Sequence, residues 1–187
     1  MSLREAHRDT AIAAADRLGH LDPGPLAELR RMTPQACAPV FWRLAAEHPD
    51  TIGRAKDEKT WIDIVRILAI LTPTGGPATR SPLHNPRRRL GEVLCDGGDR
   101  EWGGPRPLVS EARLARLMSA RGPHRTELLR HAARMIAHNR RDVGVDVADI
   151  ALVLLQPDNG RRLAEPYYRR FDRAEAAARQ SEEVATE

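Results

Sequence analysis

The stretch DEKTWIDIVRILAIL, residues 57–71, decides the fold class of this chain. Its large apolar side chains recur every three or four residues and include Trp61, Ile64, Leu68 and Leu71. That spacing places them on one face of an α-helix, so the stretch predicts an amphipathic helix packed against a core. Strand signals are nearly absent elsewhere, since only 4% of residues are aromatic and no β-branched run alternates with polar residues. We therefore expect an all-α protein.

Helix start and stop signals extend this pattern in both directions along the chain. Thr33 followed by Pro34 has the form of an N-cap with proline at the first helical position. Because Pro39 would lie inside a helix opened by Pro34, we expect that helix to be kinked or to begin later. The other predicted helices cover residues 3–18, 26–32, 87–95, 111–120, 125–138, 146–155 and 161–180.

Glycine and proline concentrate in residues 72–86, which we expect to form a loop. This Gly/Pro-rich loop would join two small helical bundles, an N-terminal one over residues 1–79 and a C-terminal one with an acidic tail over residues 80–187. A second loop is expected over residues 96–109. The chain has 187 residues and 41% apolar content, which is enough to close a core.

The sequence also carries information about the cellular compartment. No apolar run approaches the roughly 18 residues of a membrane span, and the first residues lack the apolar run of a signal peptide. Cys37 and Cys95 are far apart and form no disulfide framework, which agrees with a reducing compartment. We expect a cytoplasmic protein without a membrane partner.

Positive charge is segregated along the chain. The formal net charge is +4, and 28 of the 30 basic residues are arginines. Residues 1–79 are neutral, residues 80–141 carry +8 and residues 142–187 carry −4. Codon bias can explain arginine in place of lysine, but it does not explain this segregation. A cationic middle segment indicates a polyanion partner, of which nucleic-acid phosphates are the commonest.

Clusters of arginine supply the candidate binding residues. Guanidinium groups match phosphate oxygens, so rows of them can follow a backbone without reading bases. The predicted nucleic-acid-binding residues are Arg30, Arg31, Arg87, Arg88, Arg89, Arg113, Arg116, Arg121 and Arg125. Arg130, Arg134 and Arg141 continue the series along the next helix. For any single arginine, the alternative is an ordinary surface ion pair.

The sequence carries no recognisable catalytic, cofactor or metal signature. The glycine-rich segments at residues 75–77 and 96–99 lack the Lys-Ser/Thr pair of a phosphate-binding Walker loop. His124, His131 and His138 are seven residues apart, which is roughly 10.5 Å along a helix and too far for one metal ion. We predict no catalytic residue, no cofactor and no metal site.

One acidic cluster leaves an enzymatic alternative open. Asp142, Asp146 and Asp149 could hold Mg²⁺ in a nuclease. Asp146 is also a natural helix N-cap, and Asp149 would lie in the first helical turn, where negative charge is favourable. The capping interpretation is preferred.

Five segments in order resemble one protein family. They are LAELRR (26–31), FWRL (41–44), LGEVL (90–94), SEARLARL (110–117) and VADIA (147–151). Together they resemble the CasB family, the small subunits of the type I-E CRISPR surveillance complex Cascade, over roughly residues 26–173. The chain departs from shorter relatives of this family in the Gly/Pro-rich insertion at residues 96–109.

The resemblance implies an all-helical, two-bundle subunit without enzymatic activity. It implies as partners a second copy of the subunit, the backbone subunits that hold the guide RNA and the large subunit that reads the target. It also implies a basic face that steadies the guide RNA–target DNA duplex and the displaced strand. Arg30 or Arg31 matches the family's basic position before the FWRL-like motif, and Arg113 and Arg116 match those in the SEARL-like motif.

Three hypotheses about function follow. The first is a non-catalytic subunit that binds nucleic-acid backbone, the second is a metal-dependent nuclease that uses the aspartate cluster, and the third is a helical adaptor whose arginines pair with neighbouring proteins. The segregated charge and the order of the five segments favour the first.

Overall fold

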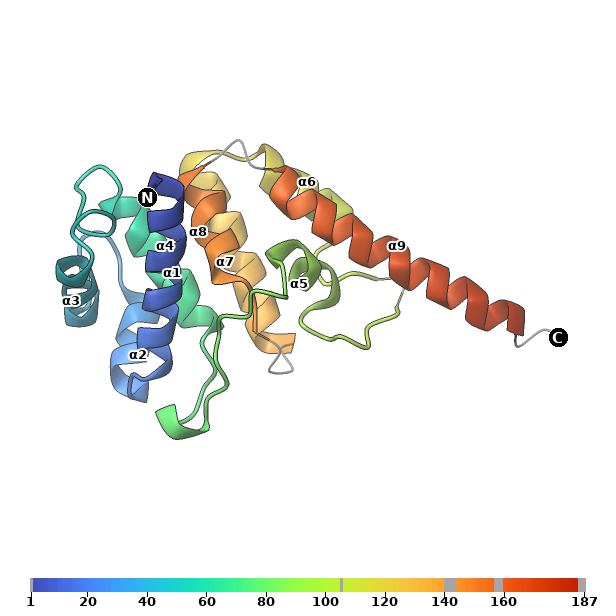
Figure 1. The fold of residues 1–187 in the computed structure, drawn as a ribbon, viewed down its shortest axis with the longest axis horizontal. Coiled ribbons are helices and arrows are strands. Elements are labelled where there is room, and N and C mark those ends of the chain that lie inside the picture. The colour runs from blue at the N-terminus through green and yellow to red at the C-terminus, as the bar shows by residue number, and fades with distance from the viewer. Residues whose placement is uncertain (1, 105, 140–143, 157–159, 185–187) are drawn as a thin grey trace.

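The computed structural model describes residues 2–104, 106–139, 144–156 and 160–184, with the side chains of residues 181–184 left out. Within these ranges the chain is all-α, as predicted, and contains no strand (Figure 1). The α-helices are α1 (Leu3–Gly19), α2 (Pro23–Arg31), α3 (Pro39–Glu47), α4 (Glu58–Leu71), α5 (Leu90–Asp96), α6 (Glu111–Ser119), α7 (Gly122–Asn139), α8 (Val147–Leu155) and α9 (Arg161–Val184). A short 3₁₀ turn, η1 (Pro77–Thr79), lies between α4 and α5. No helix in the described part of the chain is long and apolar enough to cross a membrane.

The predicted helices agree with the observed ones to within a few residues, apart from the start of α3. Pro34 does not open this helix, and the alternative that the helix begins later is confirmed, because α3 begins at Pro39 with Ala38 as N-cap. Thr33 and Ala36 instead close a tight turn through two backbone hydrogen bonds of 3.2 and 3.0 Å. Proline disfavours helical geometry in the residue before it and has no N–H to lose at a helix start, so Pro39 begins the helix rather than kinking it.

Helix α4 lies at the centre of the packing, as its sequence pattern predicted. It contacts α1, α2, α7 and α8, and Trp61 and Ile64 on it are fully buried. α1 also packs along α8, so helices from both sides of residue 79 share one hydrophobic cluster that extends from Ala11 to Tyr167. Two separate bundles are therefore not shown, and the division of the chain at residue 79 stays a prediction.

Helix α5 lies directly on the backbone of α9, and Gly91 makes this close approach possible (Figure 1). A Cβ atom at position 91 would lie 2.2 Å from the carbonyl oxygen of Leu163 and 3.0 Å from the backbone nitrogen of Tyr167. Backbone atoms inside a helix cannot rotate away as a side chain can. The glycine of the LGEVL segment is thus required by packing.

Replacing Gly91 by Ala should lower the free energy of unfolding by about 1–3 kcal/mol, because the methyl group forces α5 and α9 apart. Gly24→Ala is the matched control, since a Cβ there meets nothing within 4 Å and alanine favours a helix. Urea denaturation of both variants measures the difference. Equal stability of the two variants would contradict the packing role.

A buried histidine links α1 to the central helix. The side chain of His7 is almost fully buried, its ring lies edge-on to that of Trp61 at 6.0 Å, and neither ring nitrogen has a hydrogen-bond partner in the described structure. Burial lowers the pKa of His7, and the charge of Arg54 adds to this effect while Asp57 opposes it. His7 is therefore held in its neutral form within the core.

The low pKa of His7 should make the protein less stable in mild acid. Below about pH 6.5 the unfolded chain binds a proton at His7 that the folded chain does not, so stability falls as the pH decreases. His7→Leu should reduce the loss of Tm between about pH 7.5 and pH 5.5, whereas His124→Gln, at an exposed position, should not. Thermal melts at both pH values test this, and a pH dependence unchanged by His7→Leu would refute it.

Candidate nucleic-acid interface

Two of the predicted binding arginines, Arg88 and Arg89, form ion pairs with buried carboxylates. The first of the resulting clusters forms around Asp149. The Asp149 side chain is fully buried. Arg89 binds it with Nε 2.8 Å from Oδ2 and Nη2 2.9 Å from Oδ1, and Nη1 of Arg162 lies 2.7 Å from Oδ1. The backbone N–H of Leu90 donates to Oδ2 at 3.1 Å. This cluster ties the start of α5 to α8 and α9.

The second cluster forms around Asp96 at the other end of α5. Nη2 of Arg88 lies 2.8 Å from each carboxylate oxygen of Asp96, and Nε of Arg170 on α9 lies 2.9 Å from Oδ2. Arg170 also donates to the carbonyl of Trp102 at 2.7 Å and lies 5.2 Å from the centre of its indole ring. The segment after α5, where the sequence predicts an insertion, is thereby tied to α9.

Two further predicted arginines hold helix ends inside the protein. Arg30 donates from Nε to the carbonyl of Ala69 at 2.9 Å and from Nη2 to that of Thr72 at 3.0 Å, at the C-terminus of α4. Arg125 is only 3% exposed and donates to the carbonyls of Met118, Ala120 and Val153. These guanidinium groups donate hydrogen bonds to backbone carbonyl oxygens at helix ends, which have no acceptor role within their own helix.

The other predicted arginines lie at the surface. The exposed members of the set are Arg31, Arg87, Arg113, Arg116 and Arg121, whereas Arg88 and Arg125 are buried and Arg30 and Arg89 are half-buried. Arg121 is exposed but donates to the carbonyls of residues 118–120 at the end of α6. Contact with nucleic acid stays a prediction for the whole set, and Arg113 and Arg116 are the two that the structure brings together in a surface groove.

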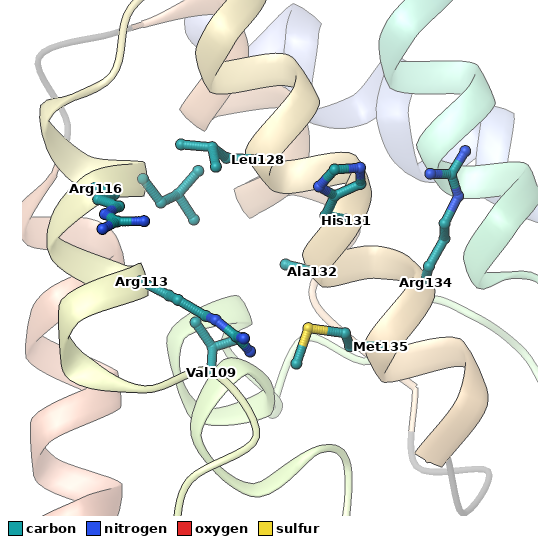
Figure 2. A pocket seen from close by; sticks show the side chains of 9 residues that line it. Val109, Arg113, Arg116, Leu128, His131, Ala132, Arg134 and Met135 are labelled. Atoms are coloured by element: carbon teal, nitrogen blue, oxygen red, sulfur yellow. The ribbon is translucent and has the colours of Figure 1, made fainter.

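This α6–α7 groove has a volume of about 420 Å³. It lies between α6 and α7, which are joined by a short turn at Ala120 and Arg121 (Figure 2). Leu114 and Leu117 of α6 are buried, whereas Arg113 and Arg116 are exposed on the adjoining face of the same helix. The groove is lined by Val109, Arg113, Arg116, Leu117, Leu128, His131, Ala132, Arg134 and Met135.

The two walls of the groove differ in charge. Arg113 and Arg116 lie on the α6 wall, whereas on the α7 side His131 borders the groove and the Arg134 side chain is directed away from it toward α4 (Figure 2). No lining residue is acidic. Glu127, outside the lining, has a carboxylate oxygen 3.0 Å from Nε2 of His131 and also pairs with Arg130.

The positive surface continues from α7 toward α4. In Figure 2 the side chain of Arg134 extends toward α4, and its charge acts on Arg66 of that helix. Partial burial lowers the pKa of Arg66, and repulsion from Arg130 and Arg134 lowers it further. Arg66 was not among the predicted binding residues, because in the sequence it is an isolated arginine between apolar residues of α4.

The aspartate cluster of the nuclease hypothesis is only partly described. Asp142 lies outside the described residues, Asp146 caps α8 by accepting from the N–H of Ala148 at 3.2 Å, and Asp149 is held by two arginines. Burial raises the pKa of Asp146, and the charge of Asp149 raises it further. Among the residues described, no group of three His, Cys, Asp or Glu side chains could hold a metal ion.

Fold and groove together define a small all-helical protein whose surface groove carries two arginines on its α6 wall. A family model described as CRISPR-associated protein Cse2 matches residues 25–181. The chain therefore belongs to the Cse2 (CasB) family, the small subunit of the type I-E CRISPR complex Cascade, as its sequence segments predicted. No curated protein and no solved structure matched the chain.

A substitution in the buried Asp149 cluster should change the free energy of unfolding far more than a substitution of an exposed arginine nearby. Asp149→Asn should lower the free energy of unfolding by about 3–5 kcal/mol, because Arg89 and Arg162 lose their shared buried counter-charge. Arg87→Ala, in the same arginine run but exposed, should change it by no more than about 0.5 kcal/mol. Guanidinium chloride denaturation measures both. An Asp149→Asn variant as stable as the parent would show that the cluster contributes nothing net.

Proposed function

We propose that this Cse2 subunit binds nucleic-acid backbone along the α6–α7 groove and so stabilises guide RNA–target DNA pairing and the displaced strand in Cascade. The observation that carries the proposal is the α6 wall of the groove, where the exposed side chains of Arg113 and Arg116 lie together with no acidic residue among the lining. The proposal adds specific contacts to the family membership.

The chemistry of the rim suits phosphates. Arginine presents forked donors that match phosphate oxygens, and these contacts fix position without reading sequence. In RNA-guided recognition the guide supplies sequence specificity by base pairing, so protein contacts need only favour the paired state. An R-loop exchanges one duplex for another of similar stability, which lets modest backbone contacts shift the balance.

The proposed partners are those of a Cascade subunit. They are the guide RNA and target DNA through phosphate contacts, the backbone and large subunits, and a second copy of this chain. Membership of a family of structural, typically non-catalytic subunits supports this assignment over the nuclease hypothesis.

Removing Arg113 and Arg116 together should weaken binding of single-stranded and duplex nucleic acid alike. Because each arginine would neutralise one phosphate, the slope of log K against log salt should become shallower by about two. The matched control is Arg17→Ala with Arg43→Ala, which removes the same charge from exposed positions on α1 and α3. Binding of labelled oligonucleotides over a salt series measures both variants.

Unchanged affinity of the Arg113→Ala, Arg116→Ala variant at low salt would refute the assignment of these residues. Failure of the unmodified protein to be retained on a nucleic-acid column at low salt would favour the adaptor hypothesis instead. Cleavage of labelled DNA with Mg²⁺ or Mn²⁺ that Asp146→Asn abolishes would establish the nuclease.

A further inference from the structure

Arg125, on α7, is buried and reaches the ends of two other helices. Its Nε lies 2.9 Å from the carbonyl oxygen of Ala120, its Nη2 2.8 Å from that of Met118 and its Nη1 3.1 Å from that of Val153. Met118 and Ala120 belong to the C-terminal end of α6, and Val153 belongs to the last turn of α8. The carbonyl end of a helix carries partial negative charge, so two such ends stabilise one buried guanidinium group. Arg125 therefore ties the end of α6 to α8.

The opposite end of α6 is held from α9. Val109 directly precedes Ser110, the N-cap of α6, and lines the groove. Its N–H donates to the carbonyl of Leu94 at 3.0 Å, and its carbonyl accepts from the hydroxyl group of Tyr167 at 2.6 Å. Val109 and Tyr167 are both buried, so water cannot readily replace this hydrogen bond. Side chains that are not part of the groove lining thus fix α6 at both ends.

We propose that Arg125 and Tyr167 are positioning residues for nucleic-acid binding. They hold α6 where Arg113 and Arg116 can meet phosphates, and they do not touch the nucleic acid. This inference rests on the proposed function. It replaces the direct contact that the sequence predicted for Arg125 by an indirect role.

The burial of Arg125 argues against direct contact with a ligand. Only 3% of the residue is exposed, and each guanidinium nitrogen already donates to a carbonyl. To reach a phosphate, the side chain would have to leave three carbonyl oxygens without this donor, which costs free energy. Arg113 and Arg116, in contrast, are exposed.

Helix α6 depends on such anchors because it is short. It has nine residues, fewer than the roughly 12–15 that an isolated helix needs to be stable in water. It packs chiefly against α7, and its buried residues are Leu114 and Leu117. With one end released, binding would have to order α6 before Arg113 and Arg116 could act together. That ordering cost would be subtracted from the affinity.

Tyr167→Phe is the mildest test, because it removes one hydroxyl group and no charge. Affinity of the full-length protein for a labelled oligonucleotide, measured well below the Tm of the variant, should fall about two- to fivefold. Thr10→Val is the matched control, because it removes a buried hydrogen bond of 2.9 Å to Thr51, and neither threonine lines the groove. Its affinity should equal that of the parent. Equal weakening by both variants would reflect a general loss of stability and would overturn the proposal.

Arg125→Lys tests the other end of α6. Lysine keeps the positive charge, but its single ammonium group cannot span the three carbonyls that the guanidinium fork reaches. Affinity should fall about three- to tenfold. Unchanged affinity in a folded Arg125→Lys variant would overturn the proposal. If this variant loses its cooperative thermal transition, Tyr167→Phe with its control decides the question.

A double-mutant cycle separates positioning from direct contact. In a protein that already carries Arg113→Ala and Arg116→Ala, neither positioning variant should weaken binding further, because α6 then has no phosphate contact to position. If the positioning variants weaken binding by the same factor as in the parent, they act independently of α6, and positioning is refuted while the proposed function stands. If Arg113→Ala with Arg116→Ala leaves binding unaffected, the proposed function fails and the positioning role fails with it.

Discussion

The fold depends on two buried aspartates, each shared between two arginines, at the two ends of α5. This helix has seven residues, which is too short to be stable without tertiary contacts. Asp149 fixes its start through Arg89 and Arg162, and Asp96 fixes its end through Arg88 and Arg170. A buried carboxylate is costly without counter-charge, so the Asp149 cluster is satisfied only when α5, α8 and α9 are in place, and the Asp96 cluster only when α5 and α9 are. The clusters therefore select this one arrangement.

The groove depends on the same arrangement. Asp96 and Arg170 hold the loop after α5, and the carbonyls of Leu94 and Cys95 accept from the N–H groups of Val109 and Leu108. Tyr167 on α9 donates to the carbonyl of Val109 at 2.6 Å. Because Val109 directly precedes the N-cap of α6, these contacts set where α6 lies against α7. The position of Arg113 and Arg116 on the groove wall follows from interactions made outside the groove.

In the structure, part of the positive charge of residues 80–141 is used inside the protein. Several arginines of the +8 segment are neutralised internally or cap helix ends, as Arg88 and Arg125 show. Nothing near Arg89 in the sequence reveals that its partner is Asp149, 60 residues away. A row of arginines along one helix is visible in the sequence, whereas the rim of the groove is assembled across α6 and α7. His131 borders the groove because it lies beside Leu128, Ala132 and Met135, which line it from α7.

The sequence by itself determined the all-α class, the extents of most helices and the family. Helix propensity, capping and apolar spacing depend on residues only a few positions apart, so these signals can be identified in the sequence. Tertiary structure decided which arginines face solvent, how the insertion at residues 96–109 is placed and where a ligand can lie. Those features depend on charges and faces brought together from distant segments. The free energy of burying a charge is set by its neighbours in space, and only the folded chain defines them.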